Sequence, residues 1–135
     1  NLHKDDSIPA VFLIGGIGIT PVRSMVEYAT IEKKNYEMHL FYSSPKKETL
    51  AFFDEFVEWT KINPKFKFIP FVDNPENDWK YEGGFINLEK IKKYLNDFTK
   101  PVFYIVGPQV MVDSMEIILI NAGVHPGKIK LERFG

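Results

Sequence analysis

Three glycines near the start of the chain mark the stretch whose chemistry is easiest to interpret. Gly15, Gly16 and Gly18 follow five consecutive apolar residues, 10–14, a run that is typical of a buried strand and too short for a buried helix. Glycine tolerates positive φ and has no Cβ, so an anionic group can approach the main-chain N–H groups of such a loop. One interpretation is a phosphate-binding loop, and the other is a tight turn between a strand and a helix without a ligand.

The two residues that end this stretch are typical of a helix start. Thr20 can cap the first N–H groups with its hydroxyl, and Pro21 suits the first helical position. Such a helix aims its unpaired N–H groups at the glycine loop, where they attract anions. The loop lacks the Lys-Ser/Thr pair of a Walker loop, and Pro21 stands where a dinucleotide fingerprint beginning at Gly16 needs its third glycine.

The elements that must position this loop alternate along the rest of the chain. Pro70 predicts that its strand lies at a sheet edge, and residues 73–84 indicate a long loop. Five alternations of strand and helix predict an α/β fold, a doubly wound five-stranded parallel sheet with helices on both faces. Strands are expected at residues 10–14, 38–42, 66–72, 101–106 and 128–134, and helices at 21–35, 48–62, after Asn87 and from Pro108 to Gly123.

Composition narrows the classes of partner and cofactor that we expect. The chain has 135 residues, the length of one domain, and 17 basic against 18 acidic residues give a net charge of −1. This balance favours neither nucleic acid nor an anionic membrane as a partner. There is no cysteine and the three histidines lie far apart, so we expect no metal site. No apolar run has the length of a membrane span, and a cytoplasmic location is expected.

Three segments in this order resemble the pyridine-nucleotide-binding domain of the ferredoxin-NADP reductase superfamily, and the resemblance covers nearly the whole chain. They are residues 15–21, 42–44 and 107–112, with a weaker match at 132–135. The resemblance implies the strand order 3-2-1-4-5 and a ligand site beyond the carboxyl ends of strands one and four. In that family a flavin-binding barrel comes first, so residues 1–9 are expected to be a linker from this barrel and 10–135 the NAD(P)-binding domain.

The resemblance also implies which residues contact the cofactors, although it identifies no certain catalytic residue. Thr20, Val106 and Gly107 would lie near the nicotinamide, and Val106 departs from the family, which often has cysteine there. Phe134 would stack on the flavin, or it could be a last core residue. The whole expected cofactor-binding set is Gly15, Gly16, Ile17, Gly18, Ile19, Thr20, Pro21, Ser43, Ser44, Lys46, Lys47, Gly107, Pro108, Gln109, Met111 and Phe134.

Several of these residues have a plain structural alternative. Ser43 and Ser44 would bind the adenosine ribose in the family, but they could equally be turn residues at a strand end. Lys46 and Lys47 could be an ordinary solvated pair. Because Pro45 stands where the resemblance places the arginine of NADP-selective relatives, we expect use of both NADPH and NADH with a slight lean to NADPH.

The function implied by the resemblance is the nucleotide-binding half of an NAD(P)H-dependent flavin oxidoreductase of ferredoxin reductase type. The chain would present the hydride of NADPH or NADH to FAD or FMN held by another domain, with an iron-sulfur or other electron-transfer partner as a further possibility. A non-catalytic nucleotide-binding regulatory domain of the same fold is the alternative. A flavodoxin-like electron carrier is less favoured, because it would need a hydroxyl-rich loop in place of the glycines.

Overall fold

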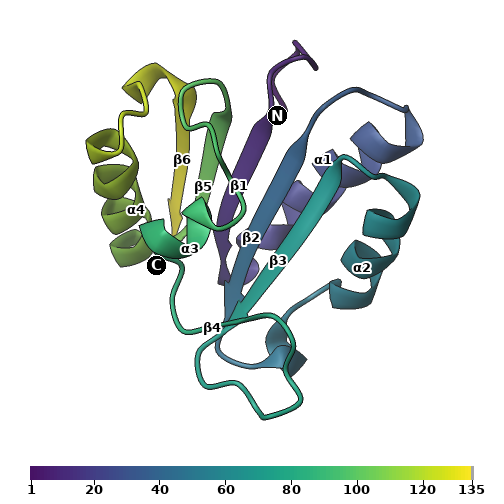
Figure 1. Ribbon diagram of the computed structural model, residues 1–135, viewed down its shortest axis with the longest axis vertical. Coiled ribbons are helices and arrows are strands. Elements are labelled where there is room, and N and C mark those ends of the chain that lie inside the picture. The colour runs from purple at the N-terminus through teal and green to yellow at the C-terminus, as the bar shows by residue number, and fades with distance from the viewer. Residues whose placement is uncertain (135) are drawn as a thin grey trace.

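The computed structural model describes residues 1–134, which fold around one parallel sheet (Figure 1). Strand β1 is flanked by β2 and β5, and every strand pair runs parallel. The central strand is apolar and buried along its whole length, as expected for a strand covered on both faces. The strands are β1 (Ala10–Gly15), β2 (Met38–Ser44), β3 (Phe66–Val72), β4 (Glu82–Gly83), β5 (Val102–Pro108) and β6 (Ile129–Phe134).

The predicted sheet was wrong in the number of strands. Six strands lie in the order β4-β3-β2-β1-β5-β6, not five, because Glu82–Gly83 pairs with the end of β3 inside the segment that was predicted to be a loop. The five longer strands keep the relative order that the resemblance implied. Since β4 pairs only with Phe71 and Val72, Pro70 lies on an open part of the edge, where its missing N–H has no strand partner to lose.

The two faces of the sheet are covered by different helices. Alternate residues of each strand point to opposite faces, and they form two separate apolar clusters. One face packs against α1 (Ile19–Ile31) and α2 (Phe53–Ile62), and the other packs against α3 (Leu88–Lys92) and α4 (Gln109–Asn121). In Figure 1, α1 lies behind the sheet and α3 lies in front of it. No helix among residues 1–134 is long and apolar enough to cross a membrane.

Two helix starts differ from the prediction. The first helix begins at Ile19 and not at Pro21, and it ends at Ile31 rather than near residue 35. The second was expected from residue 48, but a short 3-10 turn (Lys47–Thr49) comes first and α2 begins only at Phe53. Phe52 between them has φ of 63°, which interrupts the helical backbone and is costly for a residue with a side chain. By contrast, Asn87 caps α3 as predicted, and Gly123 has φ of 100° after α4.

Residues 1–8, which belong to the expected linker 1–9, pack along the sheet. Leu2 contacts the apolar cluster under α1. The ring of His3 lies 5.9 Å from that of Tyr104, and its Nδ1 is 2.7 Å from the Tyr104 hydroxyl, while its Nε2 lies 2.7 Å from the Ile8 carbonyl oxygen. Tyr36 donates to the carbonyl of His3. We call residues 1–8 the strap, because these contacts hold the segment against β5.

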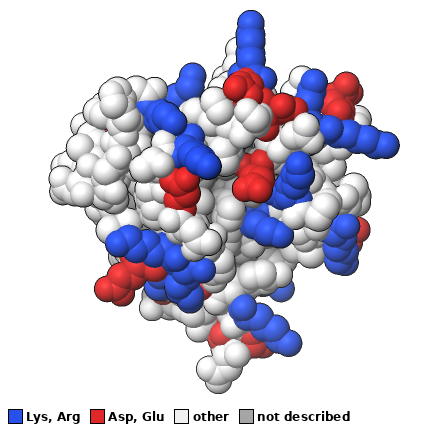
Figure 2. All heavy atoms as spheres, turned by 45° about the horizontal axis from the view of Figure 1, so that its top comes forward, with Lys and Arg blue, Asp and Glu red and all other residues white. Residues whose placement is uncertain are grey.

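Basic and acidic side chains are mixed on the surface. Figure 2 turns the amino ends of the strands toward the viewer, and Lys and Arg alternate there with Asp and Glu. This face has no broad field of one sign, in keeping with the net charge of −1.

Candidate functional site

The predicted site residues meet where β1 and β5 end side by side. Residues 10–14 of β1 are in register with 102–106 of β5, so Gly15 and Gly107 follow their strands at the same edge. A Cβ added to Gly107 would lie 3.5 Å from the Gly15 nitrogen, so the two backbones come close. In a parallel sheet whose order reverses between these strands, this carboxyl edge is where a ligand binds.

The glycine loop leaves a helix N-terminus open at this edge. Gly16 has φ of 63°, the left-handed region that favours glycine, and a Cβ there would have open space apart from Phe134 at 3.9 Å. A 3-10 turn (Gly16–Gly18) leads into α1, and no side chain caps either element. The prediction that Thr20 caps the helix was therefore wrong: Thr20 lies inside α1 and is exposed. No side chain occupies the N–H groups at the start of this helical turn, and a helix start of this kind attracts anions.

The other glycines have a packing explanation. A Cβ on Gly18 would lie 2.4 Å from Cγ1 of Val106, which excludes any larger residue unless Val106 moves. A Cβ on Gly15 would meet Sδ of Met111 at 2.5 Å, and one on Gly107 would meet the same sulfur at 2.9 Å. Val106 and Met111 thus fill the space that these glycines leave, and of the loop glycines only Gly16 needs the left-handed backbone.

Phe134 lies over the glycine loop from the last strand. It is in register with Pro108 at the end of β6, and a Cβ on Gly18 would be 3.3 Å from its ring. The ring is only partly buried. Its position at the edge of the site is compatible with both roles considered above, flavin contact and core packing. Around it, Ile17, Pro108 and Gln109 are exposed, while Ile19, the first residue of α1, is buried.

The two serines after β2 differ in their surroundings. Ser44 is only 4% exposed, and its Oγ lies 2.6 Å from Oγ1 of Thr49, so this hydroxyl helps to hold the turn. Ser43 is partly exposed on the other face of the sheet, in register with Gly15. Of the lysines that follow, Lys46 is exposed and Lys47 lies over the ring of Phe53 at 5.7 Å. Ser43 is the serine better placed for a ligand.

One acidic residue at this edge was missed by the sequence prediction. Asp73 directly follows β3, and its N–H donates to the carbonyl of Pro45 at 3.3 Å. The loops after β2 and β3 are therefore neighbours, and an acidic residue follows β3 at the edge where Ser43 and Ser44 end β2. The signal was present in the sequence as an acidic residue after an apolar strand, but only the strand order places it beside Ser43 and Ser44.

Positive charge near the start of α1 is already paired. Arg23 binds Glu55 of α2 through two bonds, with Nε to Oε2 at 2.6 Å and Nη2 to Oε1 at 3.0 Å, and its guanidinium lies 4.8 Å from the centre of the Phe52 ring. The hydrogen bond from Arg23 lowers the pKa of Glu55. This pair joins α1 to α2.

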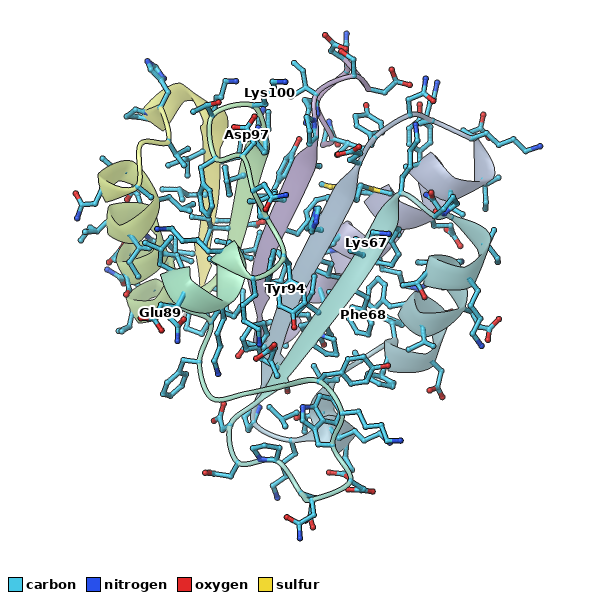
Figure 3. All side chains as sticks on the ribbon, in the orientation of Figure 1. Lys67, Phe68, Glu89, Tyr94, Asp97 and Lys100 are labelled. Atoms are coloured by element: carbon cyan, nitrogen blue, oxygen red, sulfur yellow. The ribbon has the colours of Figure 1, made fainter. Side chains whose placement is uncertain are left out.

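A nearly buried carboxylate joins β4 to the residues that directly follow α3. Glu82 accepts hydrogen bonds from Lys93 Nζ at 2.6 Å and from the hydroxyl of Tyr94, which is labelled in Figure 3. Burial opposes ionisation of Glu82, but the bonds from Lys93 and Tyr94 and the charge of Lys90 outweigh it, so the pKa of Glu82 is lowered. Burial and the bond to Glu82 raise the pKa of Tyr94 to about 12. We call Glu82, Lys93 and Tyr94 the Glu82 clamp.

Comparison with known proteins is consistent with this geometry. The family model of the oxidoreductase NAD-binding domain matches residues 12–116. The CDP-6-deoxy-L-threo-D-glycero-4-hexulose-3-dehydrase reductase of Yersinia pestis is 26% identical over 131 residues, which are 97% of this chain and 39% of the relative. One component of the Na(+)-translocating NADH-quinone reductase of Idiomarina loihiensis is 28% identical over 138 residues, covering 98% of this chain and 34% of the relative.

Solved structures have the same fold over almost the entire chain. Flavohemoglobin from Malassezia yamatoensis, with bound FAD and heme, matches with a TM-score of 0.84 and 28% identity over 99% of this chain and 33% of its own. The cytochrome b5 reductase domain of Ulva prolifera nitrate reductase has a TM-score of 0.85 at 22% identity, covering 92% of this chain and 49% of its own. The chain spans only about a third to two fifths of the curated relatives described above.

Proposed function

Because this chain belongs to the oxidoreductase NAD-binding domain family, we propose that it holds NADH or NADPH at the carboxyl edge of its sheet and presents the nicotinamide to a flavin. The flavin, FAD or FMN, is held by another domain of the parent protein. In the order that we propose, this flavin-binding domain precedes residues 1–9, and residues 10–135 form the NAD(P)-binding domain. The flavohemoglobin with bound FAD supports the choice of cofactor for the second domain.

The observation that carries this proposal is the uncapped start of α1 beside Gly16. Peptide N–H groups at a helix start satisfy a pyrophosphate without a basic side chain, and Gly16 leaves room for it to approach. The turn continues into α1 through Ile17, Gly18, Ile19, Thr20 and Pro21. The residues present therefore fit a dinucleotide, and Gly15 and Gly18 keep the loop close to β5 through Met111 and Val106.

The chain contributes position rather than a proton donor or acceptor. When bound, the reduced nicotinamide supplies a hydride, two electrons with one proton, and is oxidised as the flavin is reduced. Thr20, Val106 and Gly107 define the nicotinamide side of the edge, Val106 as an apolar wall that helps to exclude water. The Met111 side chain fills the space beside Gly15 and Gly107. Next to them, α4 begins with Pro108 as its N-cap and Gln109 as its first residue. Phe134 covers the loop where the flavin would approach.

The adenosine side favours NADH in this proposal, in place of the slight lean to NADPH expected from the sequence. Ser43 is available to a ribose, whereas the carboxylate of Asp73 can accept from ribose hydroxyls and repels a 2′-phosphate. Lys46 and Lys47 oppose this repulsion as flexible point charges, so we expect a modest preference. An iron-sulfur or other electron-transfer partner and the cytoplasmic location both stay predictions.

Reduction of a bound flavin by NADH in the parent protein tests the proposed function. The purified protein should show a flavin absorption spectrum that NADH bleaches without oxygen. The non-catalytic regulatory alternative predicts nucleotide binding without bleaching. The reductase relatives do not favour that alternative, and absence of any flavin from a folded parent protein would contradict our proposal.

A further inference from the structure

The sulfur of Met111 lies against the backbone of the proposed nucleotide edge. Met111 is the third residue of α4 and is partly exposed. A Cβ added to Gly15 would lie 2.5 Å from its Sδ, and one added to Gly107 would lie 2.9 Å from the same atom. The thioether therefore occupies the space that both glycines leave empty, at the ends of β1 and β5.

Met111 differs in this respect from the other methionines among the four of the chain. Met38 is fully buried and Met115 is only 5% exposed, so solvent has little access to either. Met25 is partly exposed, but it belongs to α1 and packs against the apolar cluster on the other face of the sheet. Of the two partly exposed methionines, Met111 is the one whose sulfur contacts the glycines of the edge.

The reaction that we propose for the parent protein also supplies an oxidant. When O₂ takes two electrons and two protons from a reduced flavin, the flavin is oxidised and hydrogen peroxide forms. We place the flavin where Phe134 covers the glycine loop, and Met111 contacts Gly15 at the start of that loop. Peroxide formed there would meet Met111 before it dilutes into the solvent.

We propose that Met111 is an oxidation site through which hydrogen peroxide lowers the affinity of this chain for NADH, an inference that rests on the proposed function. A lone pair of the sulfur attacks one oxygen of the peroxide, an S–O bond forms and the O–O bond breaks. The proton of the attacked oxygen passes to the departing oxygen, which leaves as water, and the thioether becomes a sulfoxide. The sulfur loses two electrons and the peroxide gains them. Methionine sulfoxide reductases reverse this change, so the site can be restored.

The added oxygen disturbs the packing that holds the loop in place. A sulfoxide is larger and more polar than a thioether, and the sulfur of Met111 has the backbones of Gly15 and Gly107 beside it. The oxidised side chain either pushes these backbones apart or turns toward solvent and leaves the space beside them empty, and both changes are unfavourable. In either case Gly15 and the uncapped turn after it lose the contact that fixes their position. NADH binding should therefore weaken while the sheet stays folded.

Peroxide treatment of this chain tests the proposal through binding and not through activity. Peptide mass spectrometry measures the fraction of each methionine that has gained one oxygen, and calorimetry measures the affinity for NADH. Met25→Leu and Met111→Leu each remove one partly exposed thioether with little change in volume. Oxidation of Met111 should lower the affinity at least about fivefold in the unchanged chain and in Met25→Leu. Met111→Leu, compared only with itself, should bind NADH equally before and after peroxide.

Reversal by enzymes separates this effect from a general loss of structure. The two methionine sulfoxide reductases, one for each sulfoxide epimer, should restore the affinity of the oxidised chain. If Met111→Leu binds too weakly for comparison, the loss in Met25→Leu and its reversal by the reductases decide the question.

Contrary results distinguish failure of this inference from failure of the proposed function. Full oxidation of Met111 without loss of affinity, oxidation confined to Met25, or an equal loss in Met111→Leu would each overturn the inference and leave the proposed function intact. A chain that binds no NADH before peroxide is added contradicts the proposed function itself.

Discussion

Gly16 differs from its neighbours because its backbone, and not its packing, requires glycine. Gly16→Ala should reduce the affinity for NADH by at least about tenfold, since the methyl group enters the space where we place the phosphates. The left-handed backbone adds a stability cost of about 1–2 kcal/mol. Gly123→Ala is the matched control, because Gly123 has φ of 100° and open space around it but lies at the far end of α4.

Calorimetric titration and urea unfolding together separate the two effects of Gly16→Ala. Both variants should lose similar stability, and only Gly16→Ala should lose affinity. If both bind NADH as the unchanged chain does, the phosphate is not at this loop.

Gly18 and Val106 should show strong energetic coupling. The Cβ of Gly18→Ala would lie 2.4 Å from Val106 Cγ1, and overpacking of this kind costs about 1–3 kcal/mol. Val106→Ala should remove much of that cost, so the double variant should be more stable than the sum of the single costs predicts, by about 1 kcal/mol. Urea unfolding of the four proteins measures this coupling. Additive costs would show that the loop moves away from Val106 without penalty.

Asp73 should set the preference between the two nicotinamide cofactors. We expect this chain to bind AMP more tightly than 2′-phospho-AMP. Asp73→Asn should reduce the difference, because removal of a partly exposed charge changes affinity by about 1 kcal/mol or less. Glu76→Gln removes a nearby exposed carboxylate farther from Pro45 in the sequence and serves as the control. Titrations at low and high salt measure the effect, and an undiminished preference in Asp73→Asn would exclude this role.

Single residues show how far the sequence could be interpreted. The need for glycine at Gly16 follows from local turn chemistry, which a sequence displays. Gly18 is different. Glycine is needed there because Val106, on a strand far along the chain, leaves no room for a Cβ. Ser44 looked like Ser43 in the sequence, yet the alternation of the strand turns its hydroxyl toward Thr49. Asp73 was overlooked because only the order of the strands places it beside β2.

Among the elements, the long apolar strands were predicted well, whereas two-residue β4 and the starts of α1 and α2 were not. The relative order of the five longer strands is confirmed. Two-residue β4 has no periodicity to detect, and it pairs only because β3 offers a free edge. The start of α1 was placed two residues late, because Thr20 and Pro21 are common at helix starts but the 3-10 turn at residues 16–18 begins the helix earlier.

The Glu82 clamp should make the stability of the β4–α3 corner depend on pH. Tyr94 has a folded pKa of about 12 against about 10 when unfolded, so its contribution is complete below pH 10 and is lost between about pH 10 and 12. The free energy of unfolding of Tyr94→Phe should therefore fall less steeply with pH in that range. Tyr81→Phe removes a hydroxyl without a hydrogen bond among the described residues and is the control. Urea unfolding at several pH values measures this free energy. An equal fall with pH in all three proteins would contradict the clamp.

At the scale of the whole molecule, we propose that the sheet supplies one edge of a site and that a flavin-binding domain supplies the other. The resemblance to reductase domains, predicted from three short motifs, is confirmed by the family match. Those motifs were detectable because they all lie at the carboxyl edge, where turn chemistry limits the choice of residues.

This chain alone should not retain FAD. Phe134 is the one residue for which the resemblance implied flavin contact, and a single partly buried ring gives too little contact for tight binding. Gel filtration of the purified chain after incubation with FAD should return it free of flavin, while the parent protein keeps its flavin through the same column. Stoichiometric FAD on the chain alone would contradict our proposal that another domain holds the flavin.

The contact between His3 and Tyr104 also has a consequence for the order of events during synthesis. The two residues lie 101 positions apart, and at roughly 5–20 residues per second a ribosome needs about 5–20 s to travel from one to the other. Throughout that time the strap lacks the Tyr104 hydroxyl and has only that of Tyr36, and β1 can pair only with β2 on one side. A flavin-binding domain made earlier would have finished folding before the strap is fixed, so the two halves of the reductase would come together last.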